Sequence, residues 1–327
     1  MSSPASMSPE GPIPIDSIRT ARDRLGSLVL RTPLIPTESH GEKHRLLLKL
    51  ENLQPTGSFK VRGAGNSLIA AQERGPLRGV YTTSAGNMAQ ALAWHAQRMG
   101  VPCTTIVPDT APEAKLAGIR RYGADILQLP WDEVWQITLR ADYPPFRDRL
   151  YVPPFNHPDM MAGNGTVGLE IFEDLPEVET VYVAIGGGGL IGGIASALRA
   201  VKPSVRVIAV EPETATAFTV SLREGRASEV KRTPSFVDGS GSSSVFPQIW
   251  ARLHGLVTES RIVSLEETAS SIRYLFERHR IVAEGAAGTA VAAARRESKE
   301  AGVSVAVVSG GNIDPAKLWA ILSGAIP

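Results

Sequence analysis

Short apolar segments rich in β-branched residues alternate along the chain with longer segments whose apolar residues recur at helical spacing. In the first half, this pattern predicts strands at residues 79–84, 103–108 and 125–129, with helices at 87–100 and 110–124. In the second half, it predicts strands at 180–185, 205–211 and 303–308, and helices at 194–201, 265–280, 284–297 and from Asp314 and Pro315 onward. Strands that alternate with helices form parallel sheets, so we expect an α/β fold.

Residues 130–158 interrupt this alternation, because they are rich in aromatic residues and proline. We interpret this segment as the place where the chain crosses between two domains, each with a largely parallel sheet flanked by helices. We expect the larger domain over residues 15–68 and 155–327 and the smaller one over 69–154. Residues 1–14 are rich in Ser and Pro and lack an apolar core, so we expect them to form a disordered lead.

Charge and cysteine content exclude several classes of protein. The chain has 34 Lys and Arg against 33 Asp and Glu, and this balance gives no electrostatic reason to expect nucleic acid or an anionic membrane as a partner. The single cysteine, Cys103, rules out an internal disulfide. The uncharged stretch from Thr180 to Leu198 has the length of a membrane span, but its six glycines favour a strand, a loop and a helix. We therefore expect a cytoplasmic protein.

The stretch TGSFKVRGA places Lys60 between Phe59 and a valine, with Gly57 and Gly63 nearby. Glycines indicate that another group approaches the backbone closely at this point. A lysine in apolar surroundings has a lowered pKa and becomes a nucleophile near neutral pH. By itself, the stretch fits better a lysine on an amphipathic helix whose stem lies over Phe59.

The stretch AIGGGGLIGG follows a predicted strand and precedes a predicted helix. Backbone N–H groups without side chains, together with the positive end of a helix, form a site suited to phosphate. The same loop matches a dinucleotide-binding pattern through Gly187, Gly189 and Gly192, with Glu211 closing the next strand in the place of a ribose-binding carboxylate. On the loop alone, a nicotinamide-dependent oxidoreductase competes with a phosphate site of another kind.

The dinucleotide interpretation leaves three other glycine-containing turns without a role, namely TGSFKVRGA, TTSAGNMAQA and VSGGNID. The last two follow predicted strands, at the sheet edge where ligands bind in parallel sheets. A phosphate site, a lysine in a pocket and two polar turns suit a phosphorylated aldehyde held as an imine. With KLENLQPTGSFKVRGA, GNGTVGLEI, AVEPE and VAEGAAGTAVAA, the chain resembles the fold-type II pyridoxal-phosphate enzymes, in the branch of threonine dehydratase and serine racemase.

This resemblance implies which residues hold pyridoxal 5'-phosphate. Lys60 binds the coenzyme as an imine and then acts as the base at the substrate α-carbon, and Phe59 lies against the coenzyme ring. Asn87 reaches the ring hydroxyl. Ser309 faces the pyridine nitrogen, where a neutral serine favours elimination of a β-hydroxyl over a long-lived carbanion. The phosphate is bound by Gly186, Gly187, Gly188 and Gly189.

The resemblance also implies that the turn of Ser84, Ala85, Gly86 and Asn87 holds the substrate carboxylate. The usual Ser-Ser-Gly-Asn-His turn of the family is altered here, because alanine replaces the second serine and Met88 replaces the histidine. We expect Met88 and two tryptophans, Trp131 and Trp135, either to give the substrate pocket an apolar character or to serve as core packing.

The implied activity is that of an ammonia-lyase, which dehydrates and deaminates a β-hydroxy-α-amino acid to a 2-oxo acid and ammonia. Serine, threonine, 3-hydroxyaspartate and an arylserine all remain open as substrates. Three alternatives are an amino acid racemase on the same fold, a nicotinamide oxidoreductase, and a coenzyme-binding protein without turnover. We expect a homodimer in amino acid metabolism, without isoleucine control, because the chain ends soon after the SGGN turn.

A metal site found in many relatives uses the glutamate of the VEP stretch and a nearby acidic residue. Here Glu211 is followed by PETATAF, so that Thr216 and Ala217 stand where relatives have acids and Glu213 is the remaining carboxylate. None of the six histidines has the spacing of a metal pair. We therefore expect no bound metal.

Overall fold

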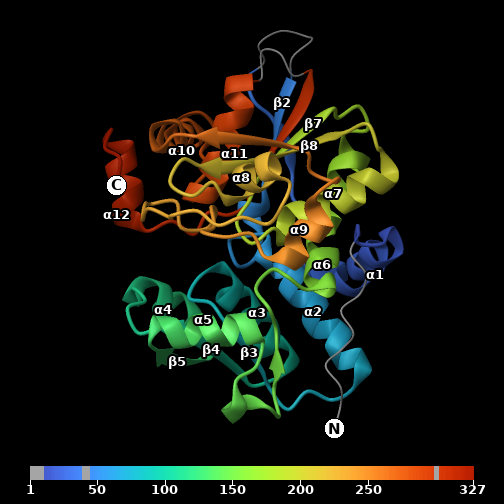
Figure 1. The fold of residues 1–327 in the computed structure, drawn as a ribbon, viewed down its shortest axis with the longest axis vertical. Helices are drawn as coiled ribbons and strands as arrows, with labels where there is room; N and C mark the ends of the chain where they lie inside the picture. The colour runs from blue at the N-terminus through green and yellow to red at the C-terminus, as the bar shows by residue number, and fades with distance from the viewer. Residues whose placement is uncertain (1–10, 39–44, 298–301) are drawn as a thin grey trace.

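The computed structural model describes residues 11–38, 45–297 and 302–327, and contains two sheets flanked by helices, which confirms the α/β prediction (Figure 1). The larger sheet has the strand order β1-β2-β10-β7-β8-β9. Its first pair, β1 and β2, is antiparallel, and the other neighbours are parallel. The strands are β1 (Leu34–Pro36), β2 (Arg45–Lys49), β7 (Thr180–Ala184), β8 (Arg206–Pro212), β9 (Glu259–Val263) and β10 (Val303–Val307).

The smaller sheet has the order β5-β4-β3-β6 and is parallel throughout. Its strands are β3 (Val80–Thr83), β4 (Cys103–Pro108), β5 (Asp125–Leu129) and β6 (Leu150–Tyr151). The first three lie where the hydrophobic pattern predicts them. The interrupted segment 130–158 is more than a crossing, because it contains both β6 and helix α5 (Trp131–Arg140).

Helices account for most of the remaining structure. In the N-terminal half they are α1 (Ile15–Leu25), α2 (Lys60–Arg74), α3 (Asn87–Met99), α4 (Glu113–Arg120) and α6 (Pro158–Asp174), with short 3-10 turns at Gly26–Leu28, Glu51–Leu53 and Pro144–Phe146. In the C-terminal half they are α7 (Gly189–Val201), α8 (Ala217–Glu224), α9 (Pro247–Leu253), α10 (Leu265–His279), α11 (Gly285–Glu297) and α12 (Pro315–Leu322). No helix within the described ranges is both long and apolar enough to cross a membrane. Thr180–Leu198 forms β7, the glycine turn and most of α7.

Alternating residues of the central strands fill two separate cores on the two faces of the larger sheet. Val181 and Val305 point to the face covered by α6 and α7, where they pack with residues such as Ile194. Tyr182 and Ala306 point to the opposite face, which α10 and α11 cover. Because successive side chains of a strand point to opposite faces, a strand buried on both faces reads as a continuous apolar run.

The smaller sheet is covered in the same way, with α3 and α4 on one face and α5 on the other (Figure 1). Val80 packs toward α3, whereas its neighbour Tyr81 packs toward Val134 and Ile137 of α5. The helix α5 is therefore fixed by burial of one of its sides. Helix α2 joins the two regions, because it packs against both α3 and α6.

A buried ion-pair network fixes the first turn of α2. Arg62 donates to both carboxylate oxygens of Glu51 at 2.8 Å and to both oxygens of Glu170 at 2.6 and 2.9 Å. Lys49 donates to the same Glu170 carboxylate at 2.6 Å. All four side chains are almost entirely buried. This network gives Arg62 a structural role, since it anchors the turn that begins with Lys60.

Residues 1–10 of the predicted disordered lead lie outside the described residues. Of its last four residues, Ile13 is buried and its backbone N–H donates to Ser196 Oγ at 2.9 Å. This contact attaches the segment before α1 to helix α7.

Candidate active site

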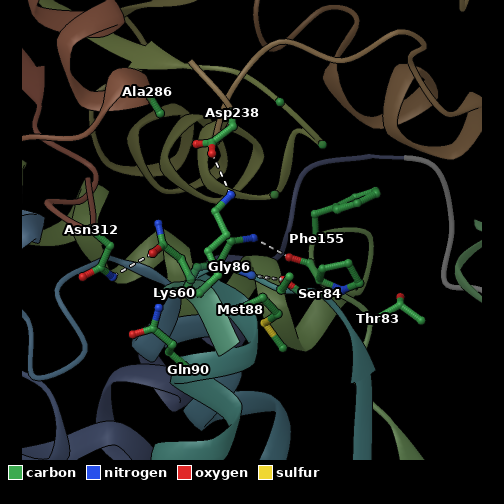
Figure 2. Close-up of a pocket in the computed structure, with 18 of the residues that line it drawn as sticks. Lys60, Thr83, Ser84, Gly86, Met88, Gln90, Phe155, Asp238, Ala286 and Asn312 are labelled. Carbon is green, nitrogen blue, oxygen red and sulfur yellow. Dashed lines mark hydrogen bonds and ion pairs between the residues drawn. The ribbon is translucent and has the colours of Figure 1, made fainter. Parts of the chain in front are cut away.

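One cavity of about 580 Å³ gathers every site residue that the sequence predicts. It lies beyond the carboxyl ends of three parallel strands, because Ser84 follows β3, Gly186 follows β7 and Ser309 follows β10. Helices and loops of both sheet regions contribute to its wall (Figure 2). The predicted residues that line it are Phe59, Lys60, Ser84, Ala85, Gly86, Asn87, Gly186, Gly187, Gly188, Gly189 and Ser309.

The loop before Lys60 is held by the SGGN turn. The N–H of Phe59 donates to the carbonyl oxygen of Ser309 at 3.0 Å, and the N–H of Gly311 donates to that of Gly57 at 2.9 Å. The side chain of Asn312 donates to the carbonyl oxygen of Thr56 at 2.8 Å. Two motifs separated by about 250 residues therefore form one unit, and helix α2 begins from it at Lys60.

Lys60 presents its amine to the cavity. Its Nζ donates to the carbonyl oxygen of Pro154 at 2.5 Å and lies 5.2 Å from the ring centre of Phe59 (Figure 2). Burial lowers the pKa of this amine to about 8, although the nearby carboxylate of Glu284 acts in the opposite direction. The carbonyl oxygen of Pro154 carries no full negative charge to balance a protonated Lys60, so part of the Lys60 amine is uncharged near neutral pH. This is the state that attacks an aldehyde.

The glycine loop lies at the N-terminus of α7. The first amides of a helix lack partners within the helix and point out along its axis, where they bind anions. Gly188 has φ +82°, a conformation that favours glycine, and a Cβ on Gly187 would lie 2.3 Å from the ring of Phe155. Gly186 differs, because a Cβ there would meet protein atoms only at 3.4 Å. Packing or backbone conformation therefore explains Gly187 and Gly188, and a Cβ on Gly189 would also lie 2.6 Å from Phe155. At Gly186, by contrast, packing leaves room beside the open amides.

The SAGN turn lies at the N-terminus of α3. Within the turn, the N–H of Gly86 donates to Ser84 Oγ at 3.2 Å, and α3 begins at Asn87. The turn thus presents a hydroxyl and helix N-terminal amides to the cavity, a combination suited to a carboxylate. Ala85 also lines the cavity, and its methyl can neither donate nor accept a proton.

Asn87 is held by two residues to which the sequence gives no role. Its Nδ2 donates to both carboxylate oxygens of Glu284 at 2.9 and 3.0 Å, and its Oδ1 accepts from Asn312 at 2.8 Å. Burial raises the pKa of Glu284 to about 7, against the hydrogen bond from Asn87. Both residues belong to motifs that carry the family resemblance, VAEGAAGTAVAA and VSGGNID. Neither motif, taken as sequence, indicates that Glu284 and Asn312 would pair with Asn87.

Glu211 does not line the cavity. Its carboxylate accepts from the N–H of Phe218 at 2.9 Å and from the N–H and hydroxyl of Thr219 at 2.8 and 2.7 Å. It therefore caps the N-terminus of α8 from a buried position, which removes the ribose-binding role that the dinucleotide interpretation gives it. Glu213 accepts from the N–H of Leu265 at 2.8 Å. Across the described residues, no group of three or more His, Cys, Asp and Glu is placed to hold a metal ion.

The site fits pyridoxal phosphate on three observations. It has an amine of lowered pKa at Lys60, an anion site at the start of α7 with free space at Gly186, and a second anion site at the start of α3. The two anion sites and the amine face one cavity. A phosphorylated aldehyde and a carboxylate substrate need these three groups together.

Comparison with known proteins gives the same assignment. The model of the family described as "Pyridoxal-phosphate dependent enzyme" matches residues 26–310. The chain is 40% identical to the L-threonine ammonia-lyase of Thermotoga maritima, over 92% of this chain and 76% of that protein. It is 34% identical to the catabolic L-threonine dehydratase of Escherichia coli K12, over 93% of this chain and 94% of that protein.

Among solved structures, a pyridoxal 5'-phosphate-dependent aspartate racemase superposes with a TM-score of 0.85, at 30% identity over 95% of this chain and 99% of that one. The relatives thus include both lyases and racemases. The family match spans most of the chain and includes the lysine loop, the SAGN turn, the glycine loop and Ser309. The chain belongs to the family of pyridoxal-phosphate dependent enzymes.

Proposed function

We propose that this protein is an ammonia-lyase that converts a β-hydroxy-α-amino acid to a 2-oxo acid and ammonia. The observation that carries the proposal is the convergence of Lys60, the glycine loop and the SAGN turn on one cavity. The relatives named for L-threonine support the same reaction.

Five parts of the chain would hold the coenzyme. Lys60 would carry it covalently through Nζ, and the amides of Gly186–Gly189 would bind its phosphate. Phe59 would lie against the ring, Ser309 would face the ring nitrogen, and Asn87 would reach the ring hydroxyl. When bound, pyridoxal phosphate withdraws electrons from the substrate α-carbon and so acidifies the α-proton.

The chain's own groups perform the remaining work. The SAGN turn binds the substrate carboxylate and so orients the α-carbon toward Lys60. The amine of Lys60 accepts the α-proton, for which its low pKa suits it near neutral pH. The β-hydroxyl takes up one proton and leaves as water, and the α-proton accepted by Lys60 balances this proton over the reaction. The released enamine is hydrolysed to the 2-oxo acid and ammonia, which balances the reaction.

Racemisation is the competing reaction at the same α-carbon, and an aspartate racemase is among the similar structures. It needs a proton donor on the face opposite Lys60. Ala85 stands where the resembling racemases have a serine, so this position cannot supply the proton. This residue favours elimination over racemisation.

The proposal extends to domains and assembly. Every strand of the smaller sheet falls within residues 69–154, and every strand of the larger sheet falls outside that range, which supports domains over 69–154 and over 15–68 with 155–327. The cytoplasmic location and the homodimer remain predictions, and sedimentation at several protein concentrations checks the second.

A substrate assay tests the reaction. The purified protein with pyridoxal phosphate should release 2-oxo acid and ammonia from at least one of L-serine, L-threonine, 3-hydroxyaspartate and threo-3-phenylserine. Lys60→Ala should lower turnover by about 10³-fold or more, because it removes both the attachment point and the base. Absence of 2-oxo acid from all four substrates contradicts the proposal.

A further inference from the structure

Helix α5 turns one face to the cavity. Trp131, Val134, Trp135 and Thr138 all line it, and their spacing of three, one and three residues places them on one side of a helix. Three of these four side chains are apolar. Trp131 is 57% exposed, so part of its ring surface is open at the cavity.

Rings connect this face to the glycine loop. Trp131 and Trp135 are stacked, with ring centres 6.2 Å apart and planes 11° apart. Trp135 contacts Phe246 at 5.9 Å between centres, and Phe246 contacts Phe155 at 5.4 Å. The ring of Phe155 in turn lies against Gly187, at the proposed phosphate site. We call the cavity-facing side of this arrangement, formed by Trp131, Val134, Trp135 and Phe155, the aromatic wall.

The other end of α5 contacts the residue that precedes the SAGN turn. Thr138 Oγ1 donates to Thr83 Oγ1 at 2.8 Å, and Thr83 also pairs with the hydroxyl of Tyr151 at 2.7 Å. Thr83 immediately precedes Ser84. The aromatic wall therefore extends between the proposed carboxylate site and the proposed phosphate site. A substrate held at its carboxylate, with its α-carbon at Lys60, has its β-substituent in this interval.

The charged groups around the cavity are less suited to a second substrate carboxylate. Lys115 is paired with Asp238 at 2.6 Å. Arg232 also lines the cavity, but from an exposed loop position. A substituent that contacts α5 meets tryptophan rings and a valine. An aromatic substituent packed against these tryptophan rings gains more binding free energy than its buried area alone provides.

We propose that the aromatic wall selects an aryl β-substituent, so that the preferred substrate class is the arylserines rather than serine, threonine or 3-hydroxyaspartate. The inference rests on the proposed lyase function, since it names the substrate of that site. Its recognition element is separate from the proposed catalytic groups, because Lys60, the SAGN turn and the glycine loop all lie outside α5.

Comparison of kcat/KM for the four substrates is the first test. Phenylserine should exceed L-serine by at least about tenfold, the scale at which an apolar pocket separates side chains. A preference for L-serine, L-threonine or 3-hydroxyaspartate overturns the inference and leaves the lyase function standing. If 3-hydroxyaspartate is the preferred substrate, Arg232 is the residue that we would examine as the partner of its second carboxylate.

Variants of α5 provide the second test. Trp135→Ala should lower kcat/KM for phenylserine at least about tenfold and change that for L-serine less than about threefold. Trp131→Ala, at an exposed position that tolerates truncation, should act in the same direction. Trp319→Ala is the matched control, because Trp319 is 73% exposed on α12 and does not line the cavity. An equal loss for both substrates in Trp135→Ala contradicts selection by the wall.

Binding without turnover separates failure of the inference from failure of the proposed function. L-Phenylalanine and L-alanine lack a β-hydroxyl, so neither can lose water. Tryptophan fluorescence of the coenzyme-loaded protein should report L-phenylalanine binding at least about tenfold tighter than L-alanine, and Trp135→Ala should abolish the difference. This result stands even if no substrate is dehydrated. Equal affinity for the two amino acids overturns the inference.

Discussion

The side-chain amide of Asn87 donates to both carboxylate oxygens of Glu284, which lies 197 residues further along the chain, at 2.9 and 3.0 Å. The pair joins the first turn of α3, from the smaller sheet region, to the start of α11, from the larger one. Burial raises the pKa of Glu284 to about 7, and Asp238 acts in the same direction. This carboxyl is therefore half-protonated at neutral pH, next to the residue proposed to contact the coenzyme ring.

Glu284 should make the coenzyme-free protein less stable as pH rises. The folded state keeps a proton on Glu284 up to about pH 7, whereas the unfolded chain loses it near 4.5. Its contribution to the free energy of unfolding should fall between these values by on the order of 3 kcal/mol. Chemical denaturation at pH 5 and pH 8 measures this loss. Glu284→Gln should flatten the dependence, and an unchanged dependence in this variant would assign it to other groups.

Lys60 should set the pH dependence of coenzyme uptake. Burial lowers its pKa to about 8 from the ordinary 10.5, so the reactive amine is half formed at pH 8 and predominates above pH 9. The rate at which coenzyme-free protein turns yellow with pyridoxal phosphate should rise about tenfold per pH unit below pH 7.5 and level off above 8.5. Borohydride should then attach the coenzyme to Lys60, as peptide mapping can show. A rate that continues to rise toward pH 10 would indicate an ordinary, solvated lysine.

Arg62→Met should destabilise the protein strongly at neutral pH. It leaves Glu51 and Glu170 buried with fewer partners, which costs about 3–5 kcal/mol for a broken buried pair. Burial alone would raise the pKa of Glu51, but Arg62 more than offsets this effect and lowers it. The stabilisation is therefore present above pH 4.5 and is lost as pH falls through the lowered pKa.

The cost of Arg62→Met should accordingly shrink as the pH falls toward 4, because Glu51 can then be neutralised by a proton. Arg74→Met is the matched control, since Arg74 is exposed and pairs with Asp159 at 3.3 Å. It should cost less than about 1 kcal/mol at either pH. Denaturation curves of both variants at pH 7.5 and 4 give the comparison, and similar costs would refute the importance of the network.

Activity should be indifferent to EDTA and to added magnesium. Hard cations need several free oxygen ligands. The carboxylate of Glu211 is already bound by the amides of α8, and Glu213 accepts from the N–H of Leu265. Turnover with and without chelator, followed by magnesium addition, checks this. A large loss on chelation that magnesium restores would mean that these carboxylates rearrange to bind the ion.

The parts of the fold that sequence predicts are those with local signals. Strands β3, β4 and β5 are short β-branched or apolar runs, and the glycine loop marks the start of α7. The SAGN turn, the glycine loop and the SGGN turn could be marked as ligand-binding because each follows a strand of a parallel sheet, where a ligand edge forms. The roles of their individual residues come from the family resemblance. Lys60 follows no strand, and its assignment depends on the family resemblance.

Other features depend on contacts between distant segments. Helix α5 has a helical pattern in WDEVWQITLR, but the surrounding prolines and aromatics obscure it, and its position is fixed by packing on Tyr81. The bond between Asn87 and Glu284 and the network around Arg62 join residues from separate elements. Such pairs leave no periodic trace in the sequence, so only the three-dimensional arrangement shows them.

Ala85 should make elimination dominate over racemisation. Once Lys60 has taken the α-proton, inversion requires a proton from the opposite face of the coenzyme, and the methyl of Ala85 cannot give one. Ser84 is one residue earlier, and its hydroxyl accepts from the N–H of Gly86 within the turn. D-Isomer and 2-oxo acid should be followed together from L-serine, L-threonine and phenylserine, and the D-isomer should remain a minor product.

Ala85→Ser should raise the share of the D-isomer by about tenfold or more, because the added hydroxyl can donate a proton as a general acid. Ser84→Ala is the control, since it should weaken substrate binding without creating a donor. Racemisation at a rate close to elimination in the unaltered protein would contradict this assignment, and would place the second proton donor on water or on another side chain of the cavity.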